Sequence, residues 1–92
     1  MSEARRTLTV VNQRGLHARA SAKFVGAVSE LPDGVEVRVA KGGKEALGGS
    51  ILGLMMLGAA RGDEIDVIVH GENAQAVLAE LSAMVEDGFG EP

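Results

Sequence analysis

Alternation of hydrophobic and polar residues predicts four short strands in this chain. Residues 7–11 alternate as a half-buried strand does, and the clearest alternation runs through residues 35–40, where valine occupies every second position. The glycine pair at 42–43 predicts a hairpin turn into a weaker strand over 45–48. A final alternation over 65–70 predicts the last strand.

Helical spacing predicts three helices between and after these strands. Residues 18–29 place Ala20, Phe24 and Val28 on one face. A short apolar helix is expected over 50–57, with Leu54 and Leu57 in the core. The last helix is expected to begin at Asn73 as its cap, with a buried stripe of Val77, Leu78, Leu81, Met84 and Val85. Residues 88–92 are expected to form a frayed tail.

The predicted order of elements is β-α-β-β-α-β-α. Four strands and three helices in 92 residues favour a single domain, 1–92, built on one sheet with one face covered by helices.

Composition narrows the function classes. The chain has no cysteine, which excludes disulfides and thiolate metal sites. A net charge of −4 and only two aromatic residues, Phe24 and Phe89, argue against nucleic-acid binding. No apolar run is long enough to span a membrane, so we expect no membrane segment and a cytoplasmic location. We also expect no cofactor or metal, because the sequence has no metal-ligand cluster, no P-loop and no G-x-G-x-x-G motif.

The segment Gly15-Leu16-His17-Ala18-Arg19-Ala20-Ser21 carries the candidate chemistry. His17 stands where a strand gives way to a helix, at or near the N-cap. Helix N-termini favour anions and disfavour imidazolium, and a neutral imidazole is a nucleophile. Arg19 offers a planar fork of donors to an oxyanion. The plainer interpretation is a polar cap followed by a solvated arginine.

Two segments resemble one family. Residues 12–25 (NQRGLHARASAKFV) are similar to the active-site segment of HPr, the histidine-containing phosphocarrier of the bacterial phosphotransferase system. Residues 49–58, followed by 61–65, resemble the family's regulatory-serine helix and the turn into its last strand. The fold that this resemblance implies is α+β: an open-faced sandwich, a four-stranded antiparallel sheet with three helices on one face.

The resemblance also implies roles for individual residues. His17 is the phosphoacceptor, bonded through its pros nitrogen, and Arg19 clamps the phosphate. Enzyme I is the donor, supplied by phosphoenolpyruvate, and an enzyme IIA protein is the recipient. Ser50 is an N-cap and a target for an HPr kinase/phosphorylase. The docking patch is formed by Ala18, Ala22, Ile51, Leu52 and Met55. The protein is then a monomeric carrier and not an enzyme.

Ala20 departs from the common pattern, in which proline follows the arginine. Alanine is an equally good helix former in the first turn, so the phosphoryl chemistry is expected to be unaffected. The His-Ala-Arg-Ala-Ser form is similar to alphaproteobacterial members that serve a nitrogen-type regulatory relay.

Two alternatives remain open at this stage. One is a regulatory module whose phosphorylation state controls its targets without onward transfer. The other is a small hydrolytic enzyme with His17 as general base. The hydrolytic enzyme needs an orienting carboxylate and a pocket, and the sequence near His17 offers neither. His70 is interpreted as a surface residue.

Overall fold

The computed structural model describes residues 2–92 and contains a four-stranded sheet. Its strands are β1 (Glu3–Thr9), β2 (Glu36–Lys41), β3 (Lys44–Leu47) and β4 (Glu64–His70). They lie in the order β1-β4-β2-β3, and each neighbouring pair is antiparallel. The last strand in the chain therefore lies in the interior of the sheet, between the first and the second.

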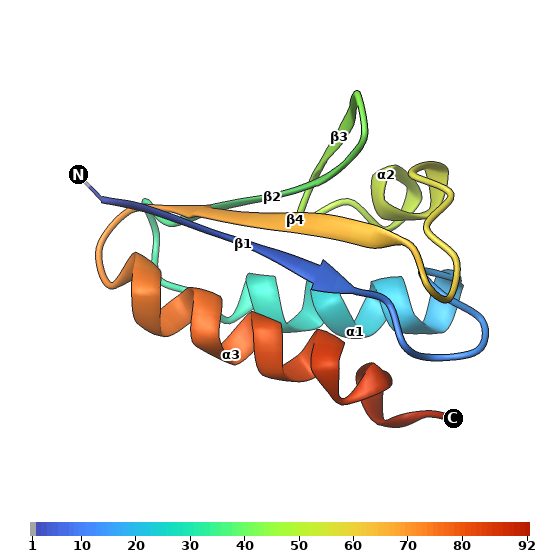
Figure 1. Cartoon of the computed structure of the whole chain (residues 1–92). Coiled ribbons are helices and arrows are strands. Elements are labelled where there is room, and N and C mark those ends of the chain that lie inside the picture. The colour runs from blue at the N-terminus through green and yellow to red at the C-terminus, as the bar shows by residue number, and fades with distance from the viewer. Residues whose placement is uncertain (1) are drawn as a thin grey trace.

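Helices α1 (Ala18–Ser29) and α3 (Ala74–Glu86) lie side by side under one face of the sheet, as Figure 1 shows. The short α2 (Ile51–Met56) packs against α1 and β3. The predicted order and the open-faced sandwich are thereby confirmed. Within residues 2–92, no helix combines the length and the apolar character that crossing a bilayer requires.

The core is aliphatic and lies between the sheet and the two long helices. Ile65, Val67 and Val69 are each at most 2% exposed, because alternate residues of β4 point toward α1 and α3. The predicted stripe of the last helix faces them, with Leu78 and Leu81 each 2% exposed. Burying such a side chain fully stabilises the fold by about 1.5–3 kcal/mol.

Some boundaries differ from the prediction. The first strand spans Glu3–Thr9 rather than 7–11, because β1 pairs along the full length of β4, from Glu3 with His70 to Thr9 with Glu64. Asn73 occupies the N-cap of α3 as predicted, but its side chain makes no capping hydrogen bond. Its backbone is left-handed instead, with φ 59°.

The expectation of a frayed tail is wrong. Residues Gly88–Gly90 form a 3₁₀ turn, η1, and Phe89 is only 3% exposed. Lys23 Nζ donates a hydrogen bond of 2.7 Å to the Phe89 carbonyl, and the Gln13 N–H donates one of 2.9 Å to the Pro92 carbonyl. The tail is docked because an apolar side chain in it reaches the core.

Candidate functional site

The loop before α1 has a conformation that requires glycine at position 15. Gly15 has φ 62°, and a Cβ there would lie 2.3 Å from the carbonyl oxygen of Ala59. The neighbouring Leu16 N–H donates to that same carbonyl at 3.0 Å. The two loops are thus in backbone contact, and this contact fixes the position from which α1 begins.

His17 is the N-cap residue of α1, as the sequence predicts. Its backbone is extended, its carbonyl accepts the first helical hydrogen bond from the Ser21 N–H at 2.9 Å, and its side chain makes no capping bond. The first turn of a helix leaves backbone N–H groups without intrahelical partners, and the helix dipole is positive there. The imidazole therefore lies at an end of the helix that favours an anion.

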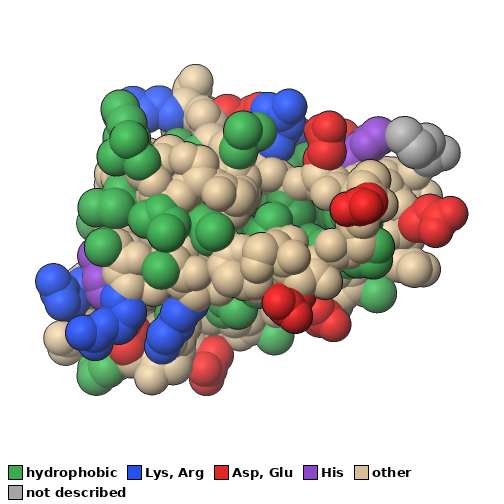
Figure 2. Space-filling model, turned by 180° about the vertical axis from the view of Figure 1, so that it is seen from behind, with side chains coloured by type: hydrophobic (Ala, Val, Ile, Leu, Met, Phe, Trp, Pro, Cys, Tyr) green, Lys and Arg blue, Asp and Glu red, His purple; other side chains and the backbone are tan. Residues whose placement is uncertain are grey.

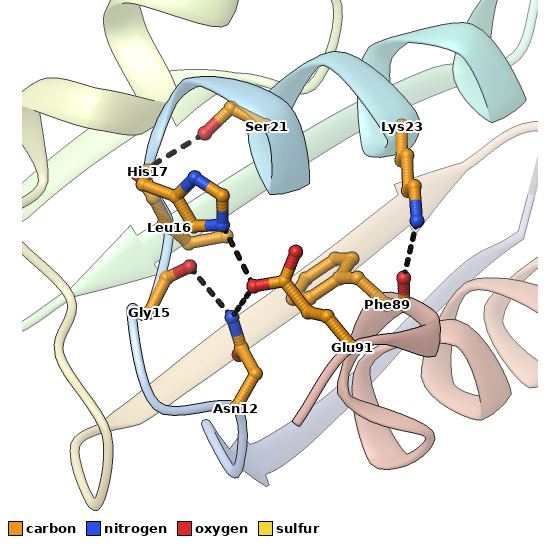
Figure 3. A network of polar contacts seen from close by, with 8 residues as sticks. All are labelled: Asn12, Gly15, Leu16, His17, Ser21, Lys23, Phe89 and Glu91. Carbon is orange, nitrogen blue, oxygen red and sulfur yellow. Dashed lines mark hydrogen bonds and ion pairs between the residues drawn. The ribbon is translucent and has the colours of Figure 1, made fainter.

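A carboxylate from the other end of the chain contacts the imidazole. Glu91 Oε1 lies 2.7 Å from His17 Nε2, and Asn12 Nδ2 donates to the same oxygen at 2.9 Å (Figure 3). The side chains of His17 and Glu91 are 15% and 14% exposed. The hydrogen bond from Asn12, and then the one to His17, lower the pKa of Glu91. The carboxylate is therefore ionised at neutral pH.

Sequence reasoning missed Glu91. The sequence near His17 offers no orienting carboxylate, but the fold supplies one from 74 positions away, because the tail folds back onto the loop. Phe89 was the available signal. An aromatic residue among polar and glycine neighbours at a terminus favours burial, and its burial brings Glu91 to the loop.

Arg19 is exposed on the first turn of α1. It lines a shallow hollow of about 170 Å³ together with Gln13, Arg14, Glu91 and Pro92. Positive side chains thus border the carboxylate that contacts His17. The hollow is open and small.

Most of α2 is exposed on one side. Ile51, Leu52 and Met55 are 41%, 67% and 40% exposed, whereas Leu54 and Leu57 are buried as predicted. Ala18 and Ala22 are exposed on α1, the helix that packs against α2. Figure 2 shows hydrophobic side chains gathered toward one end of the molecule. Basic side chains border them, and one of the two histidines lies at that boundary.

Ser50 is the N-cap of α2, as predicted. Its hydroxyl oxygen accepts a hydrogen bond of 2.9 Å from the Gly53 N–H, and the residue is partly exposed. His70 is half-buried at the end of β4, where it pairs with Glu3 and Glu36 of the neighbouring strands. His70 is 53 residues from His17 in the sequence, and the structure indicates no role for it.

Comparison with known proteins places these features in a family. A family model described as "PTS HPr component phosphorylation site" matches residues 4–87. The chain is 36% identical over 91 residues to the phosphocarrier protein NPr of Shewanella violacea, covering 99% of this chain and 98% of that protein. It is 37% identical over 87 residues to the phosphocarrier protein HPr of Neisseria meningitidis serogroup A, covering 95% and 96% of the two chains.

Solved structures agree with this result. The crystal structure of HPr-C-His from Thermoanaerobacter tengcongensis superposes with a TM-score of 0.86 at 32% identity, covering all of this chain and 99% of that one. The phosphocarrier protein HPr of Bacillus anthracis superposes with a TM-score of 0.83 at 28% identity, covering 92% of this chain and 99% of that chain. The similarity therefore extends over nearly the whole fold.

Proposed function

Because the chain belongs to the HPr family of phosphocarrier proteins, we propose that His17 accepts a phosphoryl group from enzyme I and passes it to an enzyme IIA protein. The observation that carries this proposal is the position of His17 at the N-cap of α1. There the free N–H groups of the first turn and the helix dipole favour the phosphoryl oxygens.

Arg19 is proposed as the clamp on the bound phosphoryl group. It is exposed on the same first turn and lines the hollow beside Glu91. The guanidinium has donors in a planar fork that matches two phosphoryl oxygens, and this contact is charge-assisted.

The docking surface is proposed to be formed by Ala18, Ala22, Ile51, Leu52 and Met55. Their exposure on two packed helices supports it, and the flexible side chain of Met55 suits a surface that meets several partners. Ser50 at the start of α2 is proposed as a regulatory site, since a phosphate there adds negative charge at the rim of this surface.

The physiological role is proposed to be the nitrogen-type relay in the cytoplasm, with the protein acting as a monomer. Ala20 in place of the common proline and the similarity to a protein named NPr support this assignment. A phosphoryl carrier needs no catalytic group of its own, because its partners supply the reacting machinery.

The test is phosphorylation of the purified chain by enzyme I and phosphoenolpyruvate, with the modified residue mapped by mass spectrometry. We expect phosphate on His17, and none on a His17→Ala variant that folds normally, because the variant lacks the nucleophile. Labelling at His70, or unchanged labelling of the variant, refutes the assignment. Phosphoprotein that never passes its phosphate to an enzyme IIA protein instead supports a regulatory module without onward transfer.

A further inference from the structure

The contact between Glu91 and His17 determines which ring nitrogen carries the proton. The Glu91 carboxylate is ionised at neutral pH, and an ionised carboxylate only accepts hydrogen bonds. Because Nε2 lies 2.7 Å from Oε1, Nε2 must be the nitrogen that holds the hydrogen. A neutral imidazole has one N–H, so the lone pair is left on Nδ1, which points away from Glu91 (Figure 3).

The fold holds this carboxylate in place from several sides. The Asn12 amide donates to Glu91 Oε1 and also to the Gly15 carbonyl, each at 2.9 Å. The tail on either side of Glu91 is tied to the body of the protein, by Lys23 at the Phe89 carbonyl and by the Gln13 N–H at the Pro92 carbonyl. Glu91 is therefore a fixed part of the site.

We propose that Glu91 is a positioning residue that keeps the proton on Nε2 of His17 and so reserves Nδ1 for phosphorus. The inference rests on the proposed role of His17 as phosphoacceptor. In the transfer step the Nδ1 lone pair forms the bond to phosphorus, while the bond from phosphorus to the donor breaks and its electron pair leaves with the donor. The Nε2 proton stays, and the ring gains one positive charge, which the Glu91 carboxylate offsets.

The other charged groups near Glu91 make this charge balance important. Arg14 and Arg19 line the same hollow, and Lys23 lies close enough to lower the pKa of Glu91 after the larger effects of Asn12 and His17. All three cations repel a positively charged ring. The carboxylate of Glu91 counters them at the ring nitrogen itself, and a carboxylate that accepts a hydrogen bond from one ring nitrogen is a common way to set a histidine tautomer.

The test uses potassium phosphoramidate, a small donor that phosphorylates imidazole directly and releases ammonia. The full-length protein is treated near neutral pH, and NMR distinguishes phosphate on Nδ1 from phosphate on Nε2. We expect the wild-type protein to carry phosphate on Nδ1. In Glu91→Ala, the ratio of Nδ1 to Nε2 phosphate is expected to fall by about tenfold or more, because a charge-assisted hydrogen bond is lost and Nε2 is uncovered.

Two further variants separate positioning from a general structural effect. Glu91→Gln keeps the shape and one accepting oxygen but loses the charge, and we expect an intermediate ratio. Glu86→Ala removes an exposed carboxylate at the end of α3, and we expect the wild-type ratio. Circular dichroism checks that each variant is folded, and a ratio measured on folded protein reports on the ring alone.

The result that overturns the inference is the same isomer ratio in Glu91→Ala as in the wild-type protein, or wild-type phosphate on Nε2. Phosphorylation by enzyme I is measured in parallel on the same samples. If enzyme I fails to label the wild-type protein while phosphoramidate still selects Nδ1 in a manner that depends on Glu91, the proposed function fails and the positioning role stands.

Discussion

Replacing Gly15 by alanine tests whether the contact between two loops positions His17. The added Cβ would lie 2.3 Å from the Ala59 oxygen and 2.9 Å from the Ala60 Cα, against 3.4 Å or more for ordinary contact. The loops must therefore separate by about 1 Å, which breaks the 3.0 Å hydrogen bond from the Leu16 N–H to Ala59.

The expected loss of stability follows from three contributions. A left-handed backbone costs a residue other than glycine about 1–2 kcal/mol. Relief of the steric overlap costs about 1–2 kcal/mol, and the lost hydrogen bond about 1 kcal/mol. The sum, about 3–5 kcal/mol, is a large part of the typical stability of a small domain. We expect the melting temperature to fall by about 12 °C or more.

Two other glycines serve as matched controls for this substitution. Gly58 has φ 67° but no atom within 4 Å of an added Cβ, so Gly58→Ala is expected to cost only the backbone strain, about 1–2 kcal/mol. Gly26 lies in α1 with an ordinary helical backbone and equally open space. Gly26→Ala is therefore expected to stabilise the protein by about 0.5–1 kcal/mol.

Urea denaturation of the three variants measures these differences, and labelling by enzyme I measures the effect on His17. We expect Gly15→Ala to lose stability and to accept phosphate more slowly than the two controls, because the start of α1 moves with the loop. If Gly15→Ala is no less stable than Gly58→Ala, the loop accommodates the side chain and the steric argument is wrong.

The remaining predictions concern Arg19, Ser50 and Asp63. Arg19→Ala is expected to transfer phosphate about tenfold to a hundredfold more slowly, with partial recovery in Arg19→Lys, and equal rates by rapid-quench kinetics would contradict a clamp. Ser50→Asp is expected to keep its melting temperature, because aspartate is a good N-cap. It is expected to show a raised KM for enzyme I, and this increase is expected to shrink as salt is added. A KM unchanged at low salt would show that α2 is not part of the docking surface. The Ala60 N–H donates to the Asp63 carboxylate at 2.9 Å and is the largest cause of its lowered pKa. A carboxylate whose pKa is lowered by folding stabilises the folded state at pH values above its unfolded-state pKa. This stabilisation is lost as the pH falls through the folded-state pKa. Thermal melts from pH 7 to about 3 are therefore expected to show a smaller decrease for Asp63→Asn than for the wild-type protein.

Local patterns in the sequence determined the elements and the residues that begin them. Alternation at every second residue located β2 and β4, and helical spacing located α1 and the stripe of α3. The sequence also placed His17 and Ser50 at the starts of their helices, and it separated buried Leu54 from exposed neighbours. These features are predictable because period and capping depend on residues within one or two turns of each other.

Only the tertiary structure decided how distant segments meet. The length of β1 followed from its pairing with β4. The need for glycine at position 15 followed from the close approach of the loop that carries Ala59. The approach of Glu91 to His17 depended on the burial of Phe89 and on the hydrogen bonds that tie the tail to α1 and its loop. A contact across 74 residues has no local period. It arises when the core packs, and it then sets which nitrogen of the imidazole holds the proton.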